Sequence, residues 1–264
     1  MNITLPDGSV REFASGATGM DIAKSISEGL ARNALGIIVN GVNYDLSRSI
    51  EQDASVRILT WNDDEGKEIF RHSTAHLMAE ALESLYPGVK FGIGPPIENG
   101  FYYDVDLPGD TKLSVEDLPA IENKMKELVK ADNSYQRAEK TWEEAVAYFS
   151  EKGDEYKLEL LEGLKDSEIT FYTQGNFTDL CRGTHVPSTG MLKYPKLLSV
   201  AGAYWRGDSS RQQLTRIYGT SFPKKDLLDE YLKQLEEAAK RDHKKLGREL
   251  KIFMISPMVG GGLP

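Results

Sequence analysis

Cysteine is almost missing from this 264-residue chain: Cys181 is the single one, so no internal disulfide can form. The chain also lacks any run of about 18 apolar residues, and the sequence therefore predicts no transmembrane helix. Its first residues, MNITLPDGSV, contain neither the basic nor the apolar region of a signal peptide. These absences favour a cytoplasmic protein without a membrane partner.

The formal net charge of −9 argues against a general nucleic-acid-binding surface. The charge is uneven, however, because the stretch from Arg182 to Lys225 contains eight basic residues and one acidic residue, Asp208. Such a stretch can hold phosphate groups locally even on an acidic protein. The alternative is a solvated surface on which the charge is merely uneven.

Residues 1–61 carry the pattern of a β-grasp domain, in which two strands precede a helix and further short strands. The pattern consists of alternating segments at 2–5 and 10–13, helical spacing at 19–30, and short apolar runs at 36–39 and 56–59. The segment contains no histidine and no cysteine, so we expect it to bind or dock a partner and not to catalyse.

A larger α+β domain is predicted for residues 62–223, which makes the fold class α+β throughout. Helices are expected at 64–85, 114–132, 141–150 and 154–164, and strands within 91–105 and at 169–172, 197–202 and 213–218. A linker helix is expected at 224–249, within a connecting segment 224–250. The apolar run from 251 towards the glycines near 264 predicts the start of a further domain, so we expect a fragment of a longer protein.

The rarest side chains of the sequence fall into two short motifs, His72-x3-His76 and Cys181-x3-His185. The first lies in a predicted helix, where side chains four positions apart share a face. The second lies beside Gly183 and Pro187, which predict a loop. Three interpretations remain open: a zinc site, a metal-free hydrolytic site with histidine as acid or base, and unrelated structural residues.

Three further side chains could join this site. Tyr103 offers a hydroxyl from an aromatic strand, Lys157 follows two acids, and Asp179 precedes Cys181 by two positions. Taken singly, each is more typical of a structural role, but Asp179 shares its segment with Cys181 and His185.

At these residues the sequence resembles the bacterial-type threonyl-tRNA synthetases. The motifs are His72-Ser-Thr-Ala-His76, Gly100-Phe-Tyr-Tyr-Asp104, Cys181-Arg-Gly-Thr-His185-Val-Pro187 and Ala201-Gly-Ala-Tyr-Trp-Arg-Gly-Asp208. By this resemblance, residues 1–61 are a TGS domain, 62–223 the editing domain, 224–250 the linker helix and 251–264 the first residues of the catalytic core. Thr184 stands where some relatives have proline.

The resemblance implies an editing reaction, the hydrolysis of seryl-tRNA(Thr). A synthetic site that admits threonine cannot exclude serine, because one methyl group is worth only about 1–3 kcal/mol. Carried to this sequence, the catalytic residues are His72, His76, Lys157, Asp179, Cys181 and His185. The substrate-binding residues are Tyr103, Arg182, Tyr204, Trp205 and Arg206.

The same resemblance implies that editing needs no metal and that the acceptor end of tRNA(Thr) is the partner. His72 and Lys157 would orient or activate water, Asp179 and His185 would hold the serine moiety, and Cys181 would line the pocket. ATP, magnesium, zinc and the dimer contact are expected only in a catalytic core that this chain lacks. A zinc-dependent deacylase of alanyl type and a non-catalytic tRNA-binding module remain as alternatives.

Overall fold

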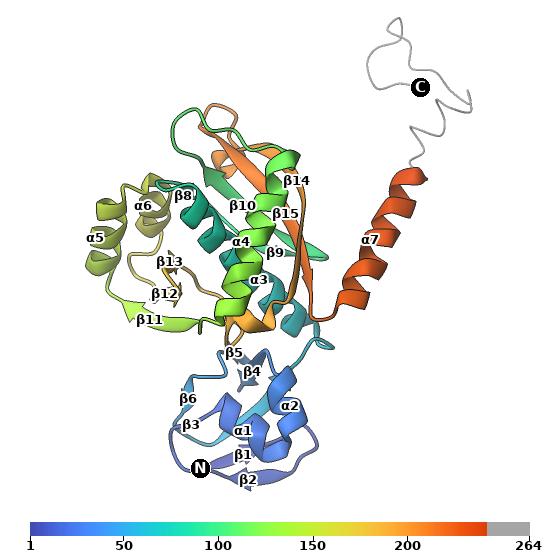
Figure 1. Ribbon diagram of the computed structural model, residues 1–264. Coiled ribbons are helices and arrows are strands. Elements are labelled where there is room, and N and C mark those ends of the chain that lie inside the picture. The colour runs from blue at the N-terminus through green and yellow to red at the C-terminus, as the bar shows by residue number, and fades with distance from the viewer. Residues whose placement is uncertain (242–264) are drawn as a thin grey trace, which may run out of the picture. The chain divides into compact units, whose positions relative to one another are not determined.

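The computed structural model describes residues 1–241, which divide into two units. Met1–Pro223 form the first unit, and the second begins at Lys224 with α7 (Lys225–Lys240). Figure 1 traces both units along the chain. The rest of the helix expected at 224–249, and the domain start expected at 251–264, lie outside the described residues. Within residues 1–241, no helix is both long and apolar enough to cross a membrane.

The N-terminal part of the first unit is the predicted β-grasp domain. Its sheet has the strand order β2-β1-β7-β4-β5, in which β1 runs parallel to β7 and antiparallel to β2. The strands are β1 (Asn2–Thr4), β2 (Val10–Glu12), β4 (Gly36–Val39), β5 (Val42–Tyr44) and β7 (Ala54–Leu59), and a small separate pair joins β3 (Ala17–Thr18) to β6 (Ser49–Ile50). Ile3, Ile22 and Ile37 are fully buried in the core beneath this sheet.

The helix predicted at 19–30 is two helices, α1 (Gly19–Ile26) and α2 (Glu28–Asn33). Ser27 separates them with an extended backbone, and its hydroxyl accepts the Leu30 N–H at the start of α2. The prediction was wrong here because the apolar spacing continues across Ser27, whereas the break depends on a local cap.

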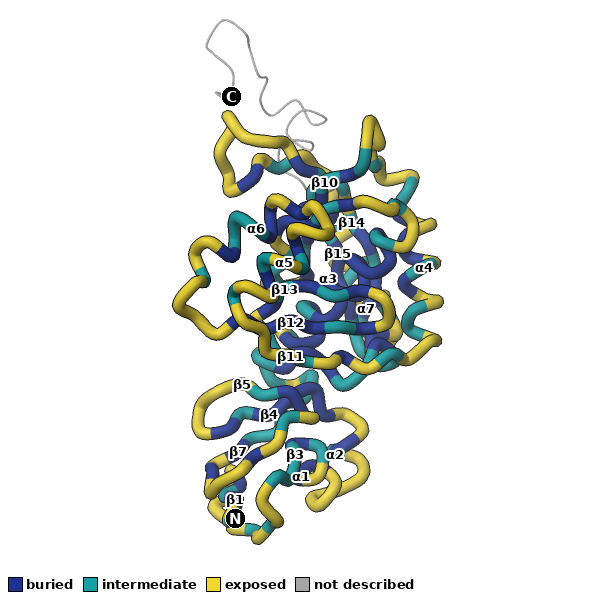
Figure 2. Tube along the Cα trace, turned by 90° about the vertical axis from the view of Figure 1, so that its left-hand side faces the viewer, coloured by how far each residue is buried: buried dark blue, intermediate teal, exposed yellow. Residues whose placement is uncertain are grey.

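The larger part of the first unit contains an antiparallel sheet with the order β14-β15-β10-β8, to which β9 adds on β10. The strands are β8 (Lys90–Phe91), β9 (Pro96–Ile97), β10 (Gly100–Asp106), β14 (Tyr194–Tyr204) and β15 (Gln213–Phe222). Two helices, α3 (Asp64–Leu85) and α4 (Leu118–Ala131), pack against this sheet and form its core with it. Figure 2 shows that the trace of α3 is buried along most of its length.

A second, three-stranded sheet has the order β11-β12-β13, with α5 and α6 packed against it. Its elements are β11 (Gln136–Lys140), β12 (Ile169–Gln174), β13 (Phe177–Leu180), α5 (Trp142–Lys152) and α6 (Glu155–Glu162). The sequence indicated the two helices and β12, whereas β11 was missed because four of its five residues are polar or charged and lie on an edge.

Helix α3 runs close to the β-grasp domain at its first turn. A Cβ atom on Gly66 would lie 1.9 Å from the carbonyl oxygen of Thr60, so a side chain larger than hydrogen cannot fit. Leu35 and Leu59 of the β-grasp domain also belong to the core that surrounds α3. Glycine at this position therefore lets the helix that carries both histidines start against the neighbouring domain.

Candidate active site

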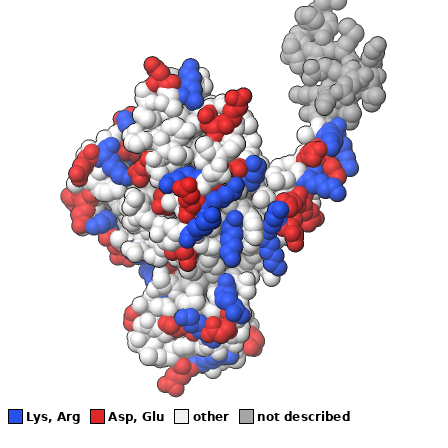
Figure 3. All heavy atoms as spheres, viewed as in Figure 1, with Lys and Arg blue, Asp and Glu red and all other residues white. Residues whose placement is uncertain are grey.

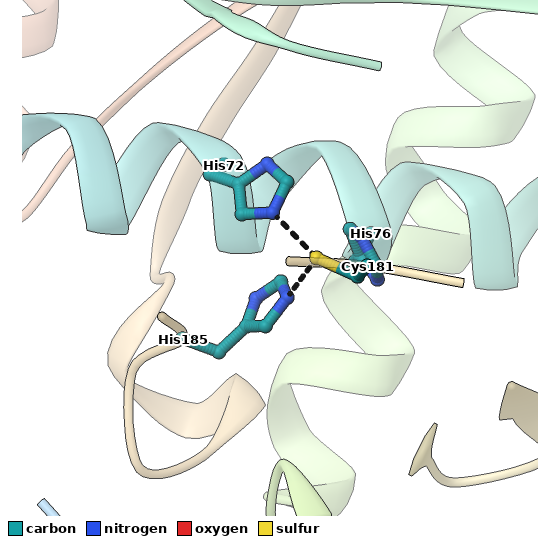
Figure 4. A group of neighbouring side chains, drawn as sticks. All are labelled: His72, His76, Cys181 and His185. Carbon is teal, nitrogen blue, oxygen red and sulfur yellow. Dashed lines mark hydrogen bonds between the residues drawn. The ribbon is translucent and has the colours of Figure 1, made fainter. Parts of the chain in front are cut away.

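Four side chains from two distant segments meet on one side of α3. His72 and His76 project from the helix, and the loop after β13 places Cys181 and His185 opposite them (Figure 4). One ring nitrogen of each histidine and the sulfur of Cys181 lie within 4.8 Å of one another. The structure thus brings together two motifs that are more than a hundred positions apart in the sequence.

The sulfur of Cys181 is the hub of this group. It lies 2.9 Å from Nε2 of His72, 3.3 Å from Nε2 of His185 and 3.3 Å from the backbone nitrogen of Gly183. Gly183 is needed for the approach of the loop to the helix, because a Cβ there would lie 2.7 Å from Nε2 of His72.

His185 is held by partners on every side. Its Nδ1 lies 3.1 Å from the hydroxyl of Ser73, and its ring stacks on Tyr135 with the planes 3° apart. The Ser73 hydroxyl donates to the carbonyl of Ile69 one turn earlier and accepts the Val186 N–H. The single proton of the Ser73 hydroxyl is used in the bond to Ile69. In the contact between Ser73 and His185, Nδ1 of His185 must therefore be the donor.

This assignment leaves the lone pair of His185 on Nε2, 3.3 Å from the sulfur of Cys181. The single thiol proton of Cys181 can be donated to Nε2 of His185 or to Nε2 of His72, and the tautomer of His72 decides between them. Nδ1 of His76 is buried and has no hydrogen-bond partner among the described residues, whereas a backbone hydrogen bond between His72 and Gly94 acts to raise the pKa of His72. Unsatisfied buried polar atoms are typical of a site that receives water or a ligand.

Burial keeps all four groups neutral. It lowers the pKa of His72 to about 4 and the pKa values of His76 and His185 well below the usual range. It also raises the pKa of Cys181 to about 12. At neutral pH the cluster therefore contains uncharged imidazoles and a thiol, and the thiolate that nucleophilic catalysis requires is not populated.

A charged pair lies beside this neutral cluster. Nζ of Lys157, at the start of α6, is 2.7 Å from one carboxylate oxygen of Asp179 and 2.8 Å from the other. The hydroxyl of Tyr103, on β10, donates to the same carboxylate and lies 3.4 Å from Nζ. Lys157 and Asp179 are both buried, so each requires the other to compensate its charge.

A cavity of about 360 Å³ opens onto these groups. Its wall includes His72, His76, Tyr103, Lys157 and Cys181. Small-molecule sites have volumes of roughly 300–1,000 Å³, so the cavity has the size of a ligand site. Asp179 and His185 are not part of its wall, and each contacts a residue that is. The structure therefore places them directly beside wall residues, and the expectation that they hold the serine moiety stays a prediction.

The residues expected to bind the substrate differ in how far they are exposed to solvent. Arg182 is exposed and lines the cavity, and Tyr204 is 42% exposed at the end of β14. Trp205 is 1% exposed, packs on Tyr156 and donates its indole N–H to Glu159. The ring of Trp205 is therefore buried in the core, and its expected role in binding the substrate stays a prediction.

Four of the eight basic residues in the stretch from Arg182 to Lys225 pair with acids from other parts of the chain. Arg206 and Arg211 pair with Glu159, Arg216 with Asp104, and Lys196 with Glu122. Acidic side chains also lie among the basic ones on the face that Figure 3 shows. The stretch is therefore less basic in the fold than along the sequence, and Arg182 is the member of it that lines the cavity.

Four supporting residues of the cluster were missed by sequence reasoning: Ser73, Tyr135, Tyr172 and Asp45. Ser73 lies between the two histidines of the motif, but its face of the helix gave no chemical signal. The two tyrosines contact the ring of His185 and come from separate segments. Asp45 comes from the β-grasp domain, for which a binding role alone was expected.

The donor set also suits a zinc ion. Three imidazoles and one thiolate are usual zinc ligands. His72, His76, Cys181 and His185 would hold the metal, which would supply a Lewis acid and a bound water of low pKa. Two ligands of one tetrahedral zinc lie roughly 3.3–3.7 Å apart, whereas Nε2 of His72 and the sulfur are 2.9 Å apart. The present arrangement of this pair is that of a hydrogen bond, and zinc would require it to separate while the donor atoms that lie up to 4.8 Å apart move closer together.

Two family models match separate parts of the chain. A model of the TGS domain matches residues 1–60. A model described as the threonyl and alanyl tRNA synthetase second additional domain matches residues 169–218, which include Asp179, Cys181 and His185. The loop half of the site thus lies within a domain found in two kinds of synthetase.

Curated relatives match over the whole chain. The threonine–tRNA ligase of Cytophaga hutchinsonii is 62% identical over 264 residues, and that of Parabacteroides distasonis is 59% identical over the same length. The threonine–tRNA ligase of Flavobacterium psychrophilum is 51% identical, again over all 264 residues. The chain spans 41%, 40% and 40% of the length of these three proteins. With its TGS domain and its second additional domain, the chain therefore corresponds to the N-terminal region of threonine–tRNA ligases.

Proposed function

We propose that this chain hydrolyses the ester between serine and the terminal adenosine of tRNA(Thr), as the editing part of a protein that attaches threonine to tRNA. The observation that carries the proposal is the cavity, which is walled by neutral histidines, a thiol and the ammonium group of Lys157. This wall belongs in part to the domain that threonyl and alanyl synthetases share.

Ester hydrolysis requires an oriented water molecule and a group that stabilises the oxyanion. Lys157 offers a positive charge at the cavity wall, and Asp179 together with Tyr103 fixes its position. With its pKa near 4, His72 is a weak base at neutral pH, so its role is to orient water by a hydrogen bond. Cys181 serves as pocket wall and hydrogen-bonding hub, and water is the nucleophile.

The physical basis of specificity is the methyl group of threonine. The wall offers imidazole groups that can bond to the serine side chain, and discrimination requires that they hold serine where the additional methyl of threonine would clash. A site that binds a substrate hydroxyl and lacks space for the methyl completes a double sieve, because the synthetic site cannot reject the smaller amino acid.

The tRNA partner would enter with its acceptor end at the cavity mouth. Arg182 is exposed there and can contact a phosphate, while Tyr204 offers an exposed ring for stacking on an unpaired base. Arg206 has 46% of its side chain exposed but pairs with Glu159, so its contribution to RNA binding would require that pair to open.

The test is the hydrolysis of seryl-tRNA(Thr) and threonyl-tRNA(Thr) by the purified chain. We expect rapid cleavage of the seryl ester and slow cleavage of the threonyl ester, and loss of the seryl reaction in the variant His72→Ala. Equal cleavage of both esters, or of neither, would contradict the proposal. Binding of tRNA(Thr) without any hydrolysis would instead indicate a non-catalytic binding module.

A zinc-dependent deacylase of the alanyl type is the second candidate, favoured by the four donor atoms that lie within 4.8 Å. The two candidates differ in their response to a chelator. Under the metal-free proposal, hydrolysis of seryl-tRNA(Thr) is unchanged after dialysis against EDTA, and metal analysis finds less than one zinc per chain. Loss of hydrolysis that added zinc restores would favour the second candidate.

A further inference from the structure

Asp45 is a buried carboxylate of the β-grasp domain whose hydrogen bonds end in the neighbouring domain. It follows β5 and is 7% exposed. One oxygen accepts the backbone N–H of His185 at 2.9 Å, and the other accepts the hydroxyl of Tyr172 at 2.7 Å. Both partners belong to the larger domain, and one of them is a member of the buried cluster.

The two partners of Asp45 also contact each other. The ring of Tyr172 stands against the ring of His185, with centroids 4.5 Å apart and planes at 60°. One carboxylate therefore fixes the backbone of His185 and, through Tyr172, one side of its imidazole. The side chain of Thr184 lies beside Gly36 of β4, where a Cβ would come within 3.5 Å of its methyl group. The loop from Cys181 to His185 thus rests on the β-grasp domain.

The position of this loop decides the geometry of the site. Within the larger domain, His185 bonds to Ser73 and Cys181 through its ring, whereas its backbone N–H is held by Asp45. A shift of His185 would move the sulfur of Cys181 away from His72, which lines the cavity. Displacements of about 1 Å in a catalytic group can cost on the order of a hundredfold in rate.

The surroundings of Asp45 also explain how a buried carboxylate is tolerated. Burial raises its pKa, while the guanidinium groups of Arg137 and Arg48 act in the opposite direction. Both arginines line a second cavity with Asp45 and Arg182. An asparagine at this position would keep an oxygen that accepts the His185 N–H, and its NH2 group could donate a hydrogen bond to the Tyr172 hydroxyl. It would also avoid the free-energy cost of burying a charge.

We propose that Asp45 is a positioning residue for the hydrolytic reaction, through which the β-grasp domain holds the loop of Cys181 and His185 against His72. This inference rests on the proposed function for its kinetic consequence. It gives the β-grasp domain a task in the editing reaction itself, besides any binding role.

The experiment compares three variants of the whole chain in hydrolysis of seryl-tRNA(Thr). Asp45→Ala is expected to lower kcat about ten- to a hundredfold with a change in KM of less than about threefold. Asp45→Asn is expected to restore kcat to within about threefold of the original, because it keeps the acceptor for the His185 N–H. The matched control is Asp53→Ala, which removes an exposed β-grasp carboxylate that accepts the Asn2 N–H at 2.7 Å. This control is expected to leave kcat unchanged.

A second readout is independent of catalysis. The chain has four histidines, so their imidazole signals can be followed individually by NMR. Asp45→Ala should shift the signals of His185 and His72, whereas Asp53→Ala should leave them in place. Tyr172→Phe keeps the ring against His185 and loses only the bond to Asp45, so it should produce a smaller shift in the same direction.

The outcomes separate the inference from the function on which it rests. If the original chain cleaves seryl-tRNA(Thr) and a folded Asp45→Ala variant cleaves it equally fast, the inference is wrong and the function stands. If the original chain does not cleave it, the function is wrong, and unchanged imidazole signals in Asp45→Ala would overturn the positioning role as well. Should Asp45→Ala fail to fold, unaltered signals and kcat in Tyr172→Phe would count against the inference.

Discussion

Lys157 and Asp179 form a buried ion pair at the floor of the candidate site, with Nζ 2.7 and 2.8 Å from the two carboxylate oxygens. The two residues come from different elements, α6 and β13, and their side chains are 4% and 3% exposed. The pair therefore ties together two elements and presents one positive charge to the cavity.

Removal of Lys157 alone should destabilise the fold more than removal of both partners. Lys157→Met leaves the Asp179 carboxylate buried without a counter-charge, which should cost about 3–5 kcal/mol in the free energy of unfolding. Adding Asp179→Asn to this variant should recover more than half of the lost stability. Urea unfolding of the single and the double variant measures the two free energies of unfolding. Neither variant should hydrolyse seryl-tRNA(Thr). Equal stability of the two would show that the charges are not coupled.

Glu80 should make stability fall as the pH rises. It is buried on α3, and burial raises its pKa to about 7. Below about pH 4.5 it is protonated in both states; between about 4.5 and 7 only the unfolded state ionises, so the free energy of unfolding falls across this window. Glu80→Gln should remove this part of the slope. The check is the unfolding free energy of both chains at pH 4.5 and 7.5, and parallel curves would contradict the assignment.

Cys181 should be unreactive and dispensable as a nucleophile. Burial raises its pKa to about 12, so the thiolate is scarce at neutral pH. Iodoacetamide should label the native chain slowly and the urea-unfolded chain rapidly, a clear readout because no other cysteine is present. Cys181→Ala should lower hydrolysis about ten- to a hundredfold, because it removes the sulfur that contacts His72, whereas loss of a true nucleophile costs several orders of magnitude. A trapped seryl-enzyme would argue for covalent catalysis.

Tyr204 and Trp205 should respond to substitution in opposite ways although they are adjacent. Tyr204→Ala removes an exposed ring, so it should raise KM for the tRNA substrate and leave the unfolding free energy within about 0.5 kcal/mol. Trp205→Ala removes a buried indole, which should cost about 3–5 kcal/mol. Thermal unfolding and steady-state kinetics of both variants test the contrast. A Tyr204→Ala variant with unchanged KM would remove the stacking role.

The sequence was informative where a pattern is local. Helix α3 begins and ends at the predicted residues, Asp64 and Leu85, because its apolar spacing and the Pro87-Gly88 stop lie within one segment. The two motifs pointed to one site, since histidine and cysteine are so rare in the chain. The β-grasp order of strands followed from short alternating runs separated by turn residues such as Asn40-Gly41, both of which have positive φ in the hairpin.

Other features could not be read from the sequence because they depend on tertiary packing. The burial of Trp205 follows from α6, whose Glu159 accepts its indole N–H. The partial pairing of the basic stretch depends on acids such as Asp104 that lie far away along the chain. The contribution of Asp45 is carried by contacts across 140 positions, for which a single sequence contains no signal.

The contact between Asp45 and the His185 loop also has a consequence for folding during translation. Asp45 leaves the ribosome 140 residues ahead of His185, and N-terminal domains fold first during translation. The β-grasp domain can therefore be complete, with its acceptor already in place, before the loop that it holds has been made. The loop of Cys181 and His185 can therefore dock, as soon as it is synthesised, against a β-grasp domain that has already folded.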